Sequence, residues 1–433
     1  MSYKIIDLPA LGRPFNATDI IEVSADGTGS YKANIGNFTL GGENYIFVNS
    51  NGTPIENGQA VRDAYTDAQA MTPNGAALSA TNRVVILLAP GYYDFDEGVL
   101  GDWYIDQSFI DFESLSGVPD VYFSSIQLIS SGIGINVRIS GIDTTKNSYY
   151  STGPFAVACS AGINESIYIR DCVGGNYSFV TFSSGFVGTI DNCVAGNYSF
   201  GYMNDTAPAG NWLLGGNTQL YGTFKNCTAG NYSFLSSQST GGGAGSVSNS
   251  GTIDNCKAGS NSFVYSIGDL ARNNGTISNC VSTGAKSFCV SDSTNGLENA
   301  GLIINCRGTA NSFVVSDNSL GLAYNTGRII DCTATGNNCF TAHILFPNQA
   351  YNYGSMINCN ASSSANAFCG ASGSNGGWIS NCLAFSQAFC CDNSFSIFGQ
   401  IYRCTLINDT FTVASTAGGR VVLGIDTTGV VNY

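Results

Sequence analysis

Two aspartates, Asp191 and Asp254, come closest by type and spacing to a pair of catalytic groups. Each stands two residues before a cysteine, and Arg170 and Lys225 occupy the same position in neighbouring repeats. Two carboxylates about 5 to 9 Å apart can cleave the glycosidic bond between them. Charges of alternating sign in stacked repeats also form an ion-pair ladder. We favour this structural interpretation of the aspartates and keep the catalytic one as the alternative.

A second candidate lies in residues 92–120, which mix eight carboxylates with seven aromatic residues. Aromatic faces and carboxylates together suit sugar binding, so Trp103, Tyr104 and Asp106 are candidate ligand-binding residues. In the alternative interpretation, which we favour, the acids solvate the outside and the apolar members are core residues of early coils: Phe95, Tyr104, Ile110 and Phe112.

No other cluster suggests a reaction. The single histidine, His343, is expected in a loop without a partner, so a nucleophile-histidine-acid triad has little support. Phosphate loops, dinucleotide fingerprints and zinc-ligand spacings do not occur in the sequence. We therefore expect no metal and no cofactor.

These residues belong to a repeat close to Gly-x-Ile-x-Asn-Cys-x-Ala-x-x-x-Ser-Phe, which returns ten times. Its cysteines are Cys172, Cys193, Cys227, Cys256, Cys280, Cys306, Cys332, Cys359, Cys382 and Cys404. Nine of them have a glycine five residues earlier, and all ten have a phenylalanine seven to nine residues later. The cysteines are 21 to 34 residues apart, which fits one coil of a solenoid.

The short apolar runs lack a 3.6-residue period, so we predict strands and an all-β, single-stranded parallel β-helix. In one unit Ile190, Cys193 and Ala195 should point inward and Asp191 outward, with Asn192 at a bend. Stacked asparagines can bond one another, and they tolerate the left-handed backbone conformation. The corner column is Asn192, Asn226, Asn255, Asn279, Asn305, Asn358 and Asn381, with Asp171, Asp331 and Arg403 in the other coils.

The phenylalanines should stack inside the core on a third strand: Phe179, Phe200, Phe234, Phe263, Phe288, Phe313, Phe340, Phe368, Phe389 and Phe411. The ten repeat cysteines should pack as small reduced hydrophobes, since parallel Cβ vectors are a poor geometry for disulfides. Six further cysteines lie mostly near the phenylalanine column: Cys159, Cys289, Cys339, Cys369, Cys390 and Cys391. A core rich in thiols indicates assembly in a reducing cytosol.

Three isoleucines, Ile304, Ile330 and Ile357, follow the charged residues in the outward column. An apolar strip on an outer face is seldom left in contact with water. Either a neighbouring subunit or a long loop should cover it, and we favour self-association.

The chain divides into four predicted parts. Residues 1–42 form a short β segment, and residues 43–82 form a linker with a capping helix from Asn57 to Met71. Val61, Ala64, Tyr65 and Ala68 lie on one face of that helix, which should cover the open end of the solenoid. Residues 83–413 form the β-helix, with clear repeats from about 167, and residues 414–433 form closing strands.

Composition excludes some partners. A net charge of −14 and no basic patch argue against nucleic acid, and no stretch is apolar enough to insert into a membrane. The first residues lack the apolar core of a signal peptide, so general secretion is not expected.

The repeat and the strand Val84-Val-Ile-Leu-Leu-Ala-Pro-Gly-Tyr-Tyr resemble the right-handed parallel β-helix of the pectin-lyase-like superfamily. The opening Ile6-Asp-Leu-Pro-Ala, with Thr18-Asp-Ile-Ile-Glu-Val-Ser, is similar to N-terminal segments of bacteriophage tail-fibre and tail-spike proteins. These resemblances imply a virion appendage made in a host cytoplasm, homotrimeric in the manner of such spikes, with residues 1–42 docked on other virion proteins.

Three functions remain open at this point. We favour a virion fibre, spike or decoration protein that binds a host surface or glycan without evident catalysis. A tail spike that degrades polysaccharide, as a hydrolase or a lyase, is the first alternative. A self-assembling extracellular filament subunit is the second.

Overall fold

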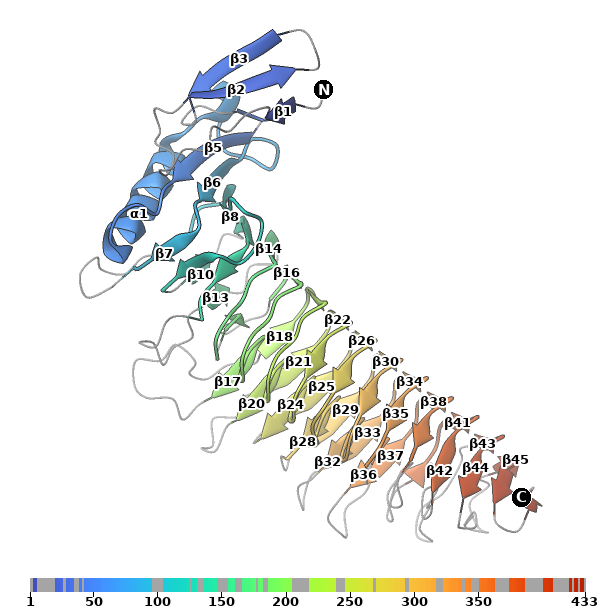
Figure 1. The fold of residues 1–433 in the computed structure, drawn as a ribbon. Coiled ribbons are helices and arrows are strands. Elements are labelled where there is room, and N and C mark those ends of the chain that lie inside the picture. The colour runs from blue at the N-terminus through green and yellow to red at the C-terminus, as the bar shows by residue number, and fades with distance from the viewer. Residues whose placement is uncertain are drawn as a thin grey trace. The chain divides into compact units, whose positions relative to one another are not determined.

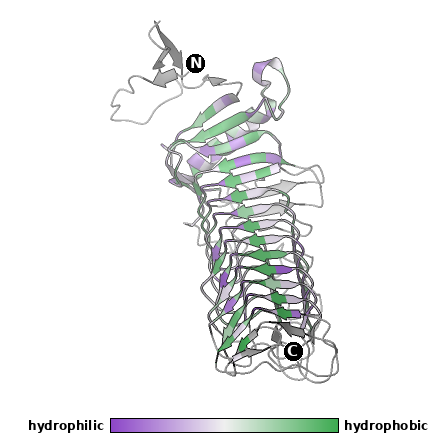
Figure 2. Cartoon of the chain, turned by 90° about the vertical axis from the view of Figure 1, so that its right-hand side faces the viewer, coloured by the Kyte–Doolittle hydropathy of each residue, from purple (hydrophilic) through white to green (hydrophobic). Residues whose placement is uncertain are grey.

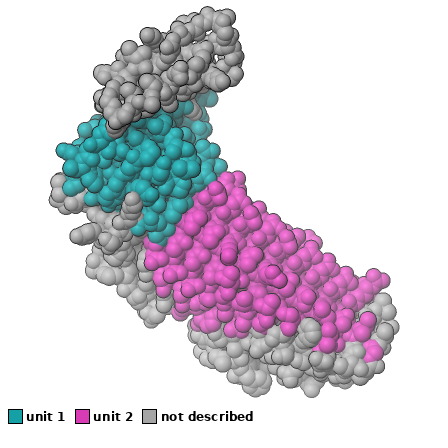
Figure 3. Space-filling view, in the orientation of Figure 1, with its two compact units in different colours: residues 1–150, 154–156, 162–175 teal, residues 151–153, 157–161, 176–433 magenta. Residues whose placement is uncertain are grey.

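The computed structural model describes residues 43–95, 104–124, 135–145, 166–176, 178–181, 186–204, 218–238, 246–267, 270–292, 296–316, 322–336, 350–362, 374–385 and 400–407, together with short segments outside these ranges. The chain forms two compact units (Figure 3). The N-terminal unit comprises Met1–Tyr150, Pro154–Ala156 and Gly162–Gly175, and the C-terminal unit comprises the remaining residues.

The N-terminal unit contains the first coils of a parallel β-solenoid. Its main sheet runs in the order β4 (Thr39–Leu40), β5 (Glu43–Val48), β6 (Val84–Leu88), β8 (Ile110–Ser114), β11 (Asn136–Ser140) and β14 (Ser166–Arg170). All neighbours from β5 onward pair in parallel, whereas β4 is antiparallel to β5. Residues 43–48, expected within a linker, therefore already form a solenoid strand. A second sheet contains β7 (Gly91–Tyr93), β9 (Val121–Phe123) and β12 (Ile142–Asp143).

Helix α1 spans Pro54–Ala70 and begins three residues earlier than the sequence pattern predicted. Thr53 is the N-cap: its hydroxyl accepts from the backbone of Glu56, whose carboxylate accepts from the backbone N–H of Thr53. This capping box stabilises the first turn, which the apolar face of the helix does not mark. The predicted face is confirmed, since Val61, Ala64, Tyr65 and Ala68 are all buried.

The predicted strands at the N-terminus are also present. They are β1 (Tyr3–Ile5), β2 (Ile20–Ala25) and β3 (Gly29–Asn34), joined in an antiparallel sheet with β2 in the centre. A 3₁₀ turn, η2, follows α1 at Pro73–Gly75. The remaining short strands are β10 (Ile126–Ser130), β13 (Phe155–Cys159) and β15 (Val180–Thr181).

The C-terminal unit is a stack of coils that build four parallel sheets (Figure 1). The first sheet contains β16 (Thr189–Asp191), β19 (Thr223–Lys225), β22 (Thr252–Asp254), β26 (Thr276–Ser278), β30 (Leu302–Ile304), β34 (Arg328–Ile330), β38 (Ser355–Ile357), β41 (Trp378–Ser380), β43 (Gln400–Tyr402) and β45 (Arg420–Val422). The second contains β23 (Lys257–Ala258), β27 (Val281–Ser282), β31 (Arg307–Gly308), β35 (Thr333–Ala334), β39 (Asn360–Ala361), β42 (Leu383–Phe385), β44 (Thr405–Ile407) and β46 (Gly424–Asp426).

The third sheet contains β17 (Tyr202–Asn204), β20 (Ser236–Gln238), β24 (Tyr265–Ile267), β28 (Val290–Ser291), β32 (Val315–Ser316) and β36 (Ala342–His343). The fourth contains β18 (Thr218–Leu220), β21 (Val247–Asn249), β25 (Ala271–Asn273), β29 (Leu297–Asn299), β33 (Ala323–Asn325), β37 (Ala350–Asn352) and β40 (Ser374–Asn375). The predicted closing strands exist as well: β46 and β47 (Gly429–Val431) form an antiparallel hairpin after the last parallel pair. An antiparallel strand thus ends the second sheet, as a solenoid edge requires.

The core consists of like residues stacked on like, and Figure 2 shows hydrophobic residues recurring at the centre of successive strands. All ten repeat cysteines are buried, and so are Cys289 and Cys339, which confirms the inward assignment. Cys159, Cys369, Cys390 and Cys391 have side chains outside the described residues. The phenylalanines from Phe179 to Phe340 stack at 4.8 to 5.0 Å between ring centroids. Phe368, Phe389 and Phe411 lie outside the described residues.

The sequence predicted that these phenylalanines lie on a third strand. They instead precede the strands of the third sheet and have a left-handed backbone conformation. Phe263 has φ 58° and Phe288 has φ 62°. A non-glycine residue in this region costs about 1 to 3 kcal/mol. Fully burying a phenylalanine side chain stabilises by about 1.5 to 3 kcal/mol, and each of its two ring stacks adds about 0.5 to 1.5 kcal/mol. Burial and stacking together therefore exceed the backbone cost and hold the turn.

The predicted asparagine corner is confirmed. Every residue in the column has φ between 50° and 55°, including Asp171, Asp331 and Arg403. Amide hydrogen bonds join some neighbours, such as Asn255 to Asn226 at 2.8 Å and Asn305 to Asn279 at 2.7 Å. At other positions the acceptor is an aspartate of the preceding coil: the side-chain amide of Asn226 donates to the carboxylate of Asp191.

A second asparagine ladder was not predicted. It lies inside the fourth sheet and comprises Asn249, Asn273, Asn299, Asn325 and Asn352, all at 0% exposure. In the first four of them, Nδ2 donates to the Oδ1 of the ladder asparagine in the next coil at 2.7 to 2.8 Å. The ladder satisfies polar groups that would otherwise be costly to bury.

Glycines form the corner between the fourth and the first sheet. A Cβ at Gly301 would lie 2.1 Å from the carbonyl oxygen of Gly275, and one at Gly327 would lie 2.1 Å from that of Gly301. The repeat glycines therefore permit the close approach of successive backbones at this corner.

Candidate functional site

The outer face of the first sheet changes character along the chain. Its first outward column begins with four threonines and continues in register as Leu302, Arg328, Ser355, Trp378 and Gln400. Its second column begins with charged residues and continues in register as Ser278, Ile304, Ile330, Ile357, the buried Ser380 and Tyr402. The outer face is therefore more varied in residue type over the later coils than over the first ones.

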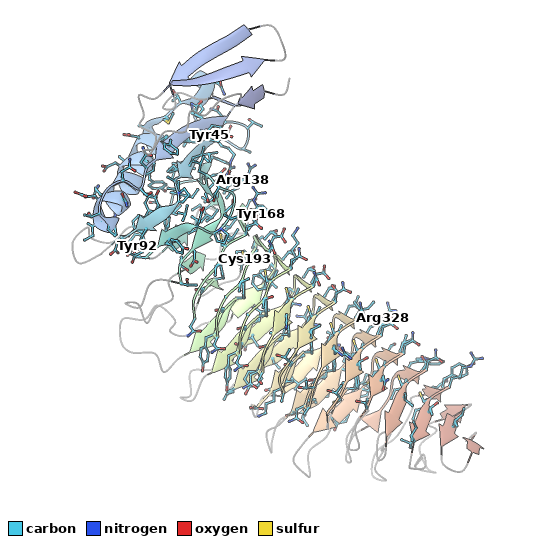
Figure 4. All side chains as sticks on the ribbon, viewed as in Figure 1. Tyr45, Tyr92, Arg138, Tyr168, Cys193 and Arg328 are labelled. Atoms are coloured by element: carbon cyan, nitrogen blue, oxygen red, sulfur yellow. The ribbon has the colours of Figure 1, made fainter. Side chains whose placement is uncertain are left out.

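A groove of about 460 Å³ lies where the glycine corner meets the first column. We call it the corner groove, and its lining residues come from four successive coils. They are Thr326, Gly327, Arg328, Tyr353, Gly354, Ser355, Gly376, Gly377, Trp378 and Gln400. The side chains on its rim are exposed, with Tyr353 at 52% and Trp378 at 40%. Figure 4 shows Arg328 at the outer edge of the stacked strands.

Glycines give the corner groove its depth. The ring of Tyr353 lies over Gly376, where an added Cβ would be 2.7 Å from Cδ1 of the tyrosine. Gly354 and Gly377 similarly have room for no side chain, because backbone of the preceding coil lies 2.0 and 2.1 Å from the Cβ position. The floor is thus backbone, and the walls are an aromatic ring, an indole and polar side chains.

More aromatic residues extend the groove on both sides. Tyr351 stacks on Tyr324 at 5.1 Å and lies 5.8 Å from Tyr353, all between ring centroids. Burial raises the pKa of Tyr351 above its ordinary value, with a smaller electrostatic contribution from Tyr324. On the other side Trp378 lies 6.0 Å from Tyr402. The result is a band of aromatic faces around one corner, a surface suited to stacking against sugar rings or other flat ligands.

The structure places Asp191 and Asp254 on the first sheet, in register with Lys225 between them. Lys225 Nζ lies 3.1 Å from Asp191 Oδ2, which agrees with the ion-pair interpretation. Asp254 Oδ1 accepts hydrogen bonds from Ser278 at 2.6 Å and Asn279 at 2.7 Å. Two coil steps of about 4.8 Å put the two Cα positions about 10 Å apart. Both carboxylates thus hold neighbouring coils together, and their catalytic role stays a prediction.

The other predicted ligand-binding residues lie in the N-terminal unit. The Tyr65 hydroxyl donates to Asp106 Oδ1 at 3.0 Å and accepts from the backbone N–H groups of Asp106 and Gln107. Burial raises the pKa of Tyr65 well above its ordinary value. Asp106 is therefore fixed to helix α1, while Tyr104 is half-buried beside it. Trp103 lies outside the described residues, so sugar binding by this segment stays a prediction.

The three isoleucines of the self-association prediction are in register in β30, β34 and β38. Each is half-buried. Ile330 and Ile357 lie two residues beyond Arg328 and Ser355 of the corner groove, in the same strands. His343 belongs to β36, opposite Ser316 of β32, and not to a loop as expected.

Within the described part of the chain, no three side chains of His, Cys, Asp or Glu are grouped so that they could hold a metal ion. The helices described by the structure all fall short of the length and apolar character that crossing a bilayer requires.

Sequence reasoning missed the corner groove because its residues differ from coil to coil. The available signal was the repeated Ala-Tyr-Asn of Ala323–Asn325 and Ala350–Asn352, followed two residues later by glycine. Because the glycines mark the corner, Tyr353 lies at the corner and Arg328 begins the next strand. Arg328 and Trp378 then lie in the same column of the first sheet, with Ser355 between them.

Comparisons of the chain with models of protein families, with curated proteins and with solved structures find no match.

Proposed function

We propose that this protein is a structural appendage, a bacteriophage fibre or spike, that binds a glycan on a host surface without cleaving it. The observation that supports this function best is the corner groove, an aromatic-walled groove across four coils with no carboxylate among the lining residues that the structure describes. Glycosidases need a pair of acidic groups beside the scissile bond. A groove without them suits retention of a sugar chain.

The rest of the molecule supports the proposal. Stacked coils with ladders of hydrogen bonds provide a stiff surface on which binding side chains keep their spacing. The resemblance of residues 1–42 to phage tail-fibre segments suggests attachment of this end to other virion proteins. The strip of Ile304, Ile330 and Ile357 supports self-association into a homo-oligomer, with a trimer as our expectation.

The enzymatic alternative depends on Asp191 and Asp254. Their Cα positions lie about 10 Å apart, and inverting glycosidases hold the two carboxyl groups about 6.5 to 9.5 Å apart, so the coil spacing is compatible with this alternative. Because Asp191 pairs with Lys225 and Asp254 accepts two hydrogen bonds, we rank this function second.

One experiment separates the three functions. The purified protein is imaged by electron microscopy and incubated with capsular polysaccharides and lipopolysaccharides from candidate hosts. Glycan retention without new reducing ends or unsaturated sugars, together with closed oligomers, is the expected result. New sugar ends that disappear in an Asp191→Asn variant would establish the enzyme, and long polymers without glycan binding would establish the filament.

A further inference from the structure

We propose that the corner groove selects an anionic glycan, a sugar polymer that carries carboxylate or phosphate groups, with Arg328 as the anion-binding residue. This inference rests on the proposed glycan-binding function and adds the chemistry of the ligand. Tyr353 and Trp378, in the next two coils, supply the stacking faces.

The lining of the corner groove is rich in hydrogen-bond donors. Arg328 presents five N–H donors and no acceptor, and the Trp378 indole donates only. Gln400, Ser355 and Tyr353 can donate or accept, and the described part of the lining contains no carboxylate. A neutral sugar brings hydroxyl donors that need strong acceptors. This lining instead complements a ligand with an excess of acceptors, such as a carboxylate or a phosphate.

Arg328 is placed to meet an external anion. Its neighbours in register are Leu302 and Ser355, neither of which carries a charge. Its side chain is exposed, and among the residues that the structure describes no carboxylate lies within ion-pair distance of it. Several other cations have such a partner: Arg83 with Asp111, Arg170 with Glu113, Lys225 with Asp191, Arg272 with Glu298 and Lys286 with Asp292.

The charge of the chain is unevenly distributed in a way that favours this site. Residues 301–433 contain four arginines and five aspartates, whereas the whole chain has a net charge of −14. One of those aspartates, Asp331, accepts a hydrogen bond from Asn358 in the corner ladder at 2.9 Å. An anionic polymer therefore meets little net repulsion over the later coils, and much more over the first 300 residues.

The size of the corner groove indicates a polymer and not a single sugar. Its lining residues come from four coils, which are three steps of about 4.8 Å and span roughly 14 Å. Tyr353 and Trp378 belong to successive coils, so their rings can face successive units of an extended chain. The groove is open along its length, which lets such a chain continue beyond it.

Binding is measured by isothermal titration and by tryptophan fluorescence with four probes. Hyaluronan carries carboxylates, poly(glycerol phosphate) carries phosphates, carboxyl-reduced hyaluronan is the neutral match of the first, and dextran is an unrelated neutral polymer. We expect one of the two anionic probes to bind, with affinity that falls as salt rises. Carboxyl-reduced hyaluronan and dextran should bind at least tenfold more weakly. The better anionic probe identifies the group that Arg328 recognises.

Three variants locate the site. Arg328→Gln should weaken binding by roughly 10- to 100-fold, as expected for loss of a charge-assisted hydrogen bond. Arg328→Lys should retain part of the affinity. The matched control is Arg307→Gln, which removes an exposed arginine of β31 in the second sheet and should bind like the parent. Both positions, Arg328 and Arg307, are exposed, and circular dichroism checks that each variant is folded.

The outcomes distinguish the preference for an anionic glycan from the proposed glycan-binding function itself. Equal binding of neutral and anionic probes, or anionic binding unchanged in Arg328→Gln, overturns the anionic assignment while glycan binding stands. Failure to bind these probes and the host glycans tested above overturns both.

Discussion

Replacing Asn299 by alanine tests whether the buried asparagine ladder stabilises the solenoid. The Asn299 amide donates to Asn325 and accepts from Asn273, each at 2.7 Å and at 0% exposure. The substitution leaves two buried groups without these partners, the Nδ2 of Asn273 and the Oδ1 of Asn325. Each such group costs roughly 1 to 3 kcal/mol, so the free energy of unfolding should fall by roughly 2 to 6 kcal/mol.

The double variant Asn299→Ala/Asn325→Ala gives the sharper result. It again leaves only two ladder groups without partners, the Nδ2 of Asn273 and the Oδ1 of Asn352. The two single variants together leave four. The double variant should therefore cost about as much as one single variant, far less than their sum.

The matched control is Asn305→Gly in the exposed corner ladder. Its partner, Oδ1 of Asn279, is reachable by water, and glycine keeps the left-handed backbone of φ 52°. We expect a loss of about 1 kcal/mol. Unfolding is followed by circular dichroism in guanidinium, with hydrogen exchange to locate the coils that open, because stacked repeats need not unfold in one step. Additive costs in the double variant, or equal costs for Asn299→Ala and Asn305→Gly, would refute the ladder as a source of stability.

Three further perturbations test the stack. Phe288→Ala removes a ring stacked at 4.8 Å on both neighbouring coils and should lower the free energy of unfolding by about 3 to 5 kcal/mol, measured by guanidinium denaturation; a loss below 1 kcal/mol contradicts the core assignment. Gly301→Ala would put a Cβ 2.1 Å from the carbonyl oxygen of Gly275 and should lower the melting temperature by several degrees, so an unchanged melting curve would show that the corner is wider than described. Burial raises the pKa of Cys289 and Cys339 to about 12 from about 9, so each thiol should lose roughly 1.4 kcal/mol of stabilisation per pH unit as pH rises through this interval. Urea titrations from pH 8 to 11 measure that loss, and Cys289→Ala should reduce the slope.

The parts of the fold that could be predicted are those that every coil repeats. Ile190, Cys193 and Asn192 recur at fixed spacing, so their inward or corner positions follow from stacking alone. The left-handed phenylalanines could not be predicted, because aromatic residues favour strands and only the stacked rings of adjacent coils justify the turn. Asn299 was missed for a similar reason: an asparagine two residues before glycine is typical of an exposed turn, and here its partners are provided by other coils.

The candidate site was harder to predict than the fold. Arg328, Tyr353 and Trp378 are 25 residues apart in sequence at each step and meet only because the coils are in register. Each of these residues occurs in one coil only, so none of them is part of the consensus pattern of the repeat. By contrast, residues 92–120 attracted attention because their acids and aromatics are contiguous, although the structure fixes Asp106 to a helix through Tyr65.

The buried ladder has a consequence for how such a molecule changes length. Asn273, Asn299 and Asn325 follow one another at intervals of 26 residues. Excising residues 299–324 would bring Asn325 to the acceptor position that Asn299 now fills, and duplicating them would insert an equivalent rung. Genetic gain or loss of such a module would change the length of the solenoid by one coil, about 4.8 Å. Each remaining ladder asparagine would still have an asparagine partner in the next coil.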